Sequence, residues 1–157
     1  MKISSLCYIE DNGKYLMLYR NAKKDDENAG KWVGIGGKFE EGESPGDCVC
    51  REVFEETGLT LHSYKFRGLV TFVSDIYPTE YMHLFTSDKF EGEIGTCSEG
   101  KLEWIDKNKL YELPMWEGDR IFLDLLDSQN EFFSLKLCYK GDKLTDAMLD
   151  NKKLDIL

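Results

Sequence analysis

Residues 37–59, GKFEEGESPGDCVCREVFEETGL, decide the fold, because they specify a helix with acidic residues on one face. If this helix covers residues 45–57, three glutamates lie about one turn apart on the same side: Glu52, Glu55 and Glu56. Like charges at this spacing destabilise an isolated helix by about 0.2–0.5 kcal/mol per pair. A divalent cation that prefers oxygen ligands would offset the repulsion, so the pattern predicts a metal site.

Both ends of this helix are marked in the sequence. Ser44 stands at the N-cap position, Pro45 at the first helical position, and Asp47 at the spacing of a capping box. Gly58 stands where a helix commonly ends in the left-handed conformation. Apolar spacing predicts the buried side of the helix, which we expect to comprise Val49, Cys50, Val53 and Phe54.

Nine residues of this stretch match the signature of the Nudix hydrolases without a gap or a substitution: Gly37, Glu43, Arg51, Glu52, Val53, Glu55, Glu56, Gly58 and Leu59. The chain therefore resembles this family. The resemblance implies an α/β fold, an α/β/α sandwich with a mixed β-sheet and a loop–helix–loop catalytic segment. It also implies a cofactor, Mg²⁺ or alternatively Mn²⁺, and hydrolysis of nucleoside diphosphates linked to another group.

The resemblance also implies roles for individual residues. The positions of Glu52, Glu55 and Glu56 bind the metal ions in this family, with help from the backbone carbonyl of Gly37. Glu99 resembles the glutamate that a separate loop adds to the metal site. One of these glutamates, or one on a separate loop, acts as the general base, and Glu99 is our candidate on such a loop. Glu52 is expected to be ligand, base or both. Three matched positions hold the loop–helix–loop together: Glu43, Arg51 and Gly58.

Outside this stretch the chain resembles the MutT-type enzymes, which hydrolyse 8-oxo-dGTP to 8-oxo-dGMP and pyrophosphate. Residues 113–119, LPMWEGD, resemble the segment in which a Trp stacks on the purine and an acidic side chain reads its edge. An aromatic plane of this kind contributes about 1–3 kcal/mol per base. With one further aromatic position and two cations, the expected substrate-binding set is Arg20, Lys38, Phe72, Trp116, Glu117 and Asp119.

Val33 departs from the MutT-type pattern, because the mammalian enzymes carry an Asn there that contacts the base. Val cannot make this hydrogen bond, so preference for oxidised over plain guanine stays open. Further nucleoside diphosphate derivatives stay open as substrates too, namely ADP-ribose, dinucleoside polyphosphates and capped RNA. Two competing hypotheses are a non-catalytic nucleotide sensor and a simple acidic metal-binding module. The complete set of glutamates disfavours the sensor.

The composition sets further bounds. Over 157 residues the formal net charge is −10, which disfavours nucleic-acid polymers as partners, because their binding requires Lys and Arg at the phosphates. The five cysteines are odd in number and form no CxxC pair, which favours reduced thiols and a cytoplasmic protein. We expect no signal peptide, no membrane span and no obligatory protein partner, and a small-molecule nucleotide as the substrate.

Alternation of apolar residues and turn signals predict the remaining elements of one domain, residues 1–157. The expected strands cover residues 3–10, 14–20, 31–39, 59–75, 79–88, 101–106, 132–139 and 143–148. An apolar stripe predicts a second amphipathic helix over residues 117–127, after a connection at 110–116. The last residues, 150–157, are expected to be peripheral.

Overall fold

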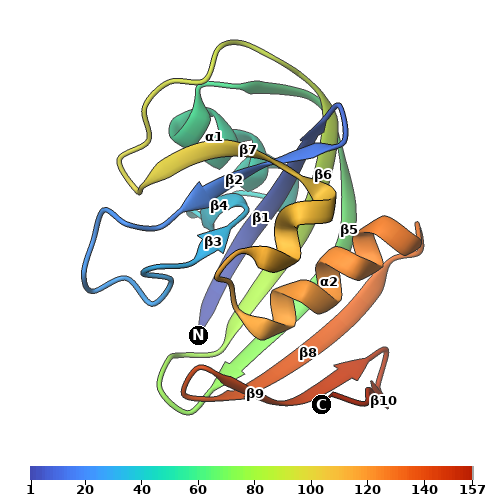
Figure 1. Ribbon diagram of the computed structural model, residues 1–157. Helices are drawn as coiled ribbons and strands as arrows, with labels where there is room; N and C mark the ends of the chain where they lie inside the picture. The colour runs from blue at the N-terminus through green and yellow to red at the C-terminus, as the bar shows by residue number, and fades with distance from the viewer. Residues whose placement is uncertain (157) are drawn as a thin grey trace.

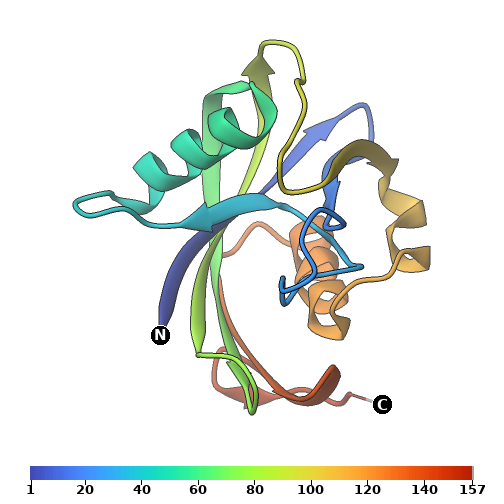
Figure 2. The ribbon, with the colours of Figure 1, turned by 90° about the vertical axis from the view of Figure 1, so that its left-hand side faces the viewer.

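Two helices lie on opposite faces of one twisted mixed sheet in the computed structural model, which describes residues 1–156 (Figures 1 and 2). Helix α1 (Pro45–Thr57) covers one face, and helix α2 (Glu117–Ser128) covers the other. This is the α/β sandwich that the sequence predicted. Within residues 1–156, no helix has the length and hydropathy needed to cross a membrane.

Ten strands form the sheet: β1 (Lys2–Asp11), β2 (Lys14–Tyr19), β3 (Trp32–Val33), β4 (Ile35–Lys38), β5 (Thr60–Ser74), β6 (Glu80–Glu91), β7 (Lys101–Asp106), β8 (Phe133–Lys140), β9 (Lys143–Leu149) and β10 (Lys152–Lys153). Their order is β10-β9-β8-β5-β6-β1-β2-β3, with β4 beside β1 and β7 beside β2. The β1–β6 and β5–β8 pairs are parallel, and the other pairs are antiparallel.

Strand β1 changes partner along one of its edges. Residues 4–7 pair with β4, whereas Glu10 and Asp11 pair with β2. The other edge of β1 pairs with β6 from Lys2 to Ile9. Because β4 leads directly into the loop before α1, this exchange of partners brings the acidic helix against the centre of the sheet.

The core forms two clusters, one under each helix. Strand β2 contributes to both: Tyr15 and Met17 face the α2 side, and Leu16 and Leu18 face the α1 side. Successive side chains of a strand point to opposite faces, so a strand covered on both sides is apolar throughout. Strand β2 is therefore packed on both faces, by the α1-side core on one and by the α2-side core on the other.

Helix α1 begins and ends where the sequence predicted. The Ser44 hydroxyl accepts from the Asp47 N–H at 3.1 Å, and the Asp47 carboxylate accepts from the Ser44 N–H at 3.0 Å. Gly58 has φ 83°, the left-handed conformation. The assignment of Phe54 to the buried side was wrong, since its side chain is 58% exposed. Position 54 is rotated about 100° from the buried Val53.

Three local features were not predicted. Residues 31–39 divide into two short strands rather than one, and a 3₁₀ helix η1 (Lys107–Glu112) precedes α2. The chain end is not peripheral either, because β10 pairs with β9 and Leu154 and Ile156 pack against the α2-side core. These features depend on partners distant in sequence, which periodicity does not report.

Candidate active site

Arg51 forms hydrogen bonds with several carboxylates along the exposed side of α1. Its Nε donates to Glu43 at 2.6 Å, and its Nη1 donates to Glu52 at 2.8 Å and to Glu55 at 3.1 Å. Its Nη2 donates to the Lys38 carbonyl at 2.9 Å, which ties the helix to the end of β4. Hydrogen bonds from Arg51 lower the pKa of Glu43 to about 2. Arg51 therefore links α1 to the preceding loop and to the end of β4.

Glu52 and Glu56 approach the backbone of β4. The Gly36 N–H donates to Glu56 at 3.3 Å, and a Cβ on Gly37 would lie 2.5 Å from the Glu52 carboxyl carbon. Only glycine permits this close approach. Burial, reinforced by the neighbouring Glu52 charge, raises the pKa of Glu56 to about 8, and burial also raises the pKa of Glu52.

Glu99 lies in the loop between β6 and β7, and its carboxylate pairs with basic side chains. Its carboxylate forms ion pairs with Arg20 at 3.3 Å and Lys23 at 3.3 Å. Arg20 also donates to Asp26 at 2.5 Å. The charges of Arg20 and Glu99 both act on the pKa of Glu56, so this loop borders the acidic face of α1.

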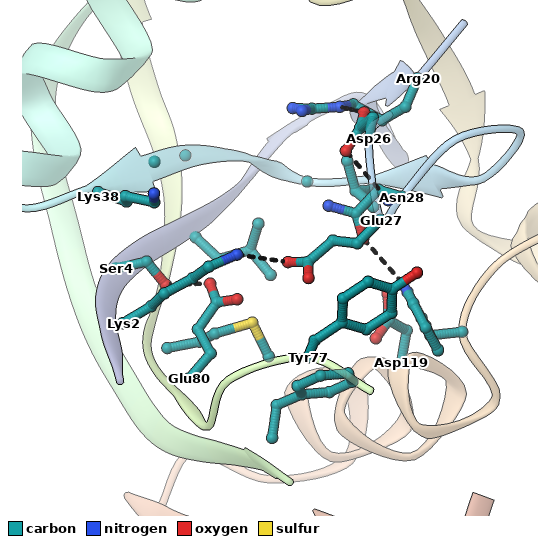
Figure 3. A pocket seen from close by; sticks show the side chains of 18 of the residues that line it. Lys2, Ser4, Arg20, Asp26, Glu27, Asn28, Lys38, Tyr77, Glu80 and Asp119 are labelled. Carbon is teal, nitrogen blue, oxygen red and sulfur yellow. Dashed lines mark hydrogen bonds and ion pairs between the residues drawn. The ribbon is translucent and has the colours of Figure 1, made fainter. Parts of the chain in front are cut away.

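A cavity of about 800 Å³ opens beside the glycines of β4, on the side of the sheet that α2 covers. Its walls come from β1, β4, the loop after β2, the β5–β6 turn and the start of α2 (Figure 3). Five of the six expected substrate-binding residues line it: Arg20, Lys38, Phe72, Trp116 and Asp119. Glu117 does not, because its carboxylate accepts from the Leu144 N–H at 3.1 Å and anchors β9 instead. The structure therefore favours Asp119 over Glu117 as the acidic residue in the cavity.

The indole of Trp116 is held on several sides and is only 5% exposed. Its Nε1–H donates to the Asn28 side chain at 2.8 Å. Phe72 and Tyr139 contact it edge-on, with ring centroids at 5.4 Å and 5.0 Å. Lys31 Nζ lies 4.3 Å from the ring centroid. A ring fixed in this way needs little reordering when a flat ligand stacks on it.

Asp119 is a buried carboxyl without a partner. It lies in the first turn of α2 and is 7% exposed, and no residue among 1–156 forms a side-chain hydrogen bond or ion pair with its carboxyl group. Burial raises its pKa to about 8, against the lowering effect of Arg120 and Lys31. Buried polar groups normally have partners, so Asp119 is available to a ligand in the cavity.

Comparison with known proteins identifies the family. The family model described as the NUDIX domain matches residues 2–126. This chain belongs to the Nudix family. The Uncharacterized Nudix hydrolase YvcI of Bacillus subtilis is 36% identical over 125 residues, which cover 76% of this chain and 75% of that protein. The Oxidized purine nucleoside triphosphate hydrolase of Danio rerio is 31% identical over 151 residues, which cover 95% and 94%.

Solved structures agree with this membership of the Nudix family. A MutT protein from Bacillus halodurans matches with a TM-score of 0.85 at 30% identity, over 97% of this chain and 99% of that one. A MutT protein from Methanosarcina mazei matches with a TM-score of 0.71 at 28% identity, over 80% and 92%. The protein is thus a Nudix hydrolase with the MutT-type fold, and enzymes of this family act on small-molecule nucleotide substrates.

Nudix hydrolases generally use divalent metal ions, and the α1 carboxylates fit such an ion. Glu56 is a half-buried carboxyl that forms no ion pair with a Lys or Arg of residues 1–156, and Glu52 lies beside it. Carboxylate oxygens suit hard divalent cations. In the described part of the chain no three acidic, His or Cys side chains are already grouped around one point, because Arg51 holds Glu52 and Glu55. Binding of a metal cation at this place would require Glu52 and Glu55 to leave their ion pairs with Arg51.

Sequence reasoning missed several residues that line this cavity. Glu80, Ser4 and Tyr77 line the cavity, and the pair Lys2–Glu27, at 3.0 Å, closes one side of it (Figure 3). Alternation along β6 could have grouped Glu80 with Met82 on one face. The parallel pairing that brings this face beside Ser4 has no local signal.

Proposed function

We propose that this Nudix hydrolase converts 8-oxo-dGTP to 8-oxo-dGMP and pyrophosphate, with Mg²⁺ as its cofactor and Mn²⁺ as a possible substitute. Such an activity removes a damaged precursor from the nucleotide pool before it enters DNA. One observation carries the proposal: the cavity beside the β4 glycines, on the α2 side of the sheet, is lined by the unpartnered Asp119 together with Trp116 and Phe72. The name of the Danio rerio relative supports the same substrate class.

The base end of the cavity suits a purine with amino and imino donors. Stacking on Trp116 is tolerant of sequence and contributes about 1–3 kcal/mol per base. The Asp119 carboxylate accepts from N1–H and N2–H₂ of a guanine-type base, as acidic side chains do with amino donors of bases. Because no side chain of residues 1–156 pairs with the Asp119 carboxyl group, such donors would meet a hydrogen-bonding group that the protein leaves free.

The phosphate end of the cavity lies near α1. Lys38 and Arg20 line the cavity and supply positive charge, and the glycine backbone of β4 allows close approach. We assign Glu52, Glu55, Glu56 and the Gly37 carbonyl to the metal. When bound, the cation neutralises phosphate charge and lowers the pKa of a bound water. We assign the general base, which takes the proton from the attacking water, to Glu52 or Glu99.

The proposal extends to the whole chain. A single sheet joins strands from both ends of the sequence, so we assign residues 1–157 to one domain. No cysteine of residues 1–156 is in a disulfide, which supports a reducing compartment, and we place the protein in the cytoplasm. We expect it to act on free nucleotides without a nucleic-acid polymer, a membrane or an obligatory protein partner.

A substrate panel tests this proposal directly. The purified protein is incubated with Mg²⁺ and, separately, 8-oxo-dGTP, dGTP, 8-oxo-GTP, ADP-ribose and diadenosine tetraphosphate, and kcat/KM is measured for each. We expect the highest kcat/KM with 8-oxo-dGTP, and 8-oxo-dGMP and pyrophosphate as products. Turnover of ADP-ribose or diadenosine tetraphosphate alone would refute the assignment of substrate. Absence of all turnover would refute the assignment of the catalytic residues.

A further inference from the structure

Glu80 is a second carboxylate that faces the base end of the cavity. It is the first residue of β6 and is half-buried, and its Oε2 accepts from the Ser4 hydroxyl at 2.6 Å. The adjacent cation, Lys2, binds Glu27 rather than Glu80. No Lys or Arg of residues 1–156 forms an ion pair with Glu80, so its other oxygen is free for a ligand.

The sheet register places Glu80 beside the expected stacking residues. Glu80 is the cross-strand partner of Phe72, and such pairs have Cβ atoms about 4.5–5.5 Å apart. Phe72 in turn contacts the Trp116 ring. A flat base beside these two aromatic side chains therefore lies within reach of the Glu80 carboxylate.

Asp119 enters the same cavity from a different side. Figure 3 shows Glu80 beside Ser4 at the start of β6, and Asp119 on α2 beyond Tyr77. Burial raises the pKa of Asp119, and the charge of Glu80 adds a smaller contribution in the same direction. Neither carboxyl group forms an ion pair with a Lys or Arg of residues 1–156, and an ionised carboxylate only accepts hydrogen bonds. The favourable occupant is a base with donors on two separate edges.

Oxidation of guanine at C8 creates such a base. Plain guanine has donors at N1 and N2, but N7 and O6 are acceptors. In the 8-oxo form N7 carries a hydrogen, so a second edge gains a donor. A carboxylate opposite N7 therefore attracts 8-oxoguanine and repels the lone pair of guanine. This contact would supply the discrimination that Val33 does not.

We propose that Glu80 is a specificity-determining residue that accepts a hydrogen bond from N7–H of an oxidised guanine while Asp119 binds the N1 and N2 edge. The proposal rests on the substrate class proposed above and names the residue that distinguishes the oxidised base. It assigns Glu80 no part in phosphate hydrolysis.

The test measures binding of the product nucleotides, so that it does not depend on turnover. Dissociation constants of 8-oxo-dGMP and dGMP are measured by calorimetry for the wild type and for Glu80→Gln. Gln retains the hydrogen bond to Ser4 but can donate to N7 of plain guanine. We expect the wild type to prefer 8-oxo-dGMP, and the ratio of the two constants to fall about tenfold in the variant. Glu27→Gln is the matched control, because it removes the same charge from the cavity wall and should leave the ratio unchanged.

A third ligand tests the same contact without any mutation. In 7-deaza-dGMP position 7 is a C–H group, which neither accepts nor repels as N7 does, so wild-type affinity should fall between those for dGMP and 8-oxo-dGMP. An unchanged ratio in Glu80→Gln, an equal change in Glu27→Gln, or no wild-type preference for 8-oxo-dGMP would each overturn the inference. A protein that passes these binding tests but does not hydrolyse 8-oxo-dGTP would overturn only the proposed function.

Discussion

At the scale of single residues, the buried carboxyl group of Asp119 affects both the stability of the folded protein and the binding of a ligand in the cavity. Burial raises its pKa from an ordinary value of 3.8 to about 8 in the folded protein. Between these two values the folded state holds a proton that the unfolded state has lost, so this group lowers stability progressively as the pH rises. Binding of a donor-rich base at Asp119 would offset that loss.

We therefore expect Asp119→Asn to raise the thermal midpoint, and to do so more at a pH of about 9 than at a pH of about 5. Asn cannot ionise, so the variant does not lose stability over this interval. At the higher pH the gain in unfolding free energy should exceed about 1 kcal/mol, since one pKa unit corresponds to about 1.4 kcal/mol. Thermal denaturation of both proteins across the pH range measures this. A difference that is constant with pH would show that Asp119 does not titrate as described.

At the scale of elements, α1 has a structural side and a side to which we assign the catalytic residues. Its buried side, with Val49 and Val53, packs on the sheet, and its caps are complete. On its acidic side, Arg51 is the only Lys or Arg of residues 1–156 that forms an ion pair with Glu52 or Glu55. Loss of one exposed carboxylate should therefore leave the fold intact.

Glu55→Gln tests this separation of functions. We expect kcat/KM to fall by a factor of about 100 or more, the usual range for a group that acts on the reacting centre. The thermal midpoint without metal should stay near or above that of the wild type, because the change relieves repulsion between carboxylates. Added Mg²⁺ should stabilise the wild type more than the variant. If the variant unfolds, Glu55 is a structural residue. Glu41→Gln, in the loop before α1, serves as the control, because Glu41 is exposed and its carboxylate has no hydrogen bond or ion pair within residues 1–156.

The elements that the sequence predicted well are those with local signals. Ser44, Asp47 and Gly58 determine the ends of α1 through contacts within a few residues. The exposure of Phe54 was missed because Cys50 and Phe54 seemed to extend the apolar side, whereas the sheet covers only the Val49–Val53 side. Strand β10 and the place of Glu80 in the cavity depend on pairing between distant segments. The family signature identified the candidate metal ligands, but not the walls of the base pocket.

At the scale of the whole molecule, charge opposes substrate approach. The net charge is −10 and a nucleoside triphosphate is also an anion, so long-range repulsion slows their encounter, while Arg20 and Lys38 attract phosphate only at short range. Salt screens the long-range part more than contacts within the pocket.

We therefore expect kcat/KM for 8-oxo-dGTP to rise when moderate salt is added at constant free Mg²⁺. Initial rates at subsaturating substrate over a series of KCl concentrations measure this effect. An uncharged cosolute at matched osmolarity is the control. If kcat/KM instead falls steadily from the lowest KCl concentration, the Lys and Arg side chains at the cavity, rather than the net charge of the protein, dominate the electrostatic field that the nucleotide meets.

The pairing of β1 has a consequence for synthesis on the ribosome. β1 is made well before β6, yet one of its edges pairs with β6, with Ser4 opposite Met82. Its apolar residues Cys7, Tyr8 and Ile9 must therefore wait for more than half of the chain before that edge is covered. Non-local parallel pairing of this kind forms slowly and leaves strand edges open to association with other chains. Strand β1, which pairs along both edges in the finished sheet, is thus a segment that chaperones would protect while the chain is being made.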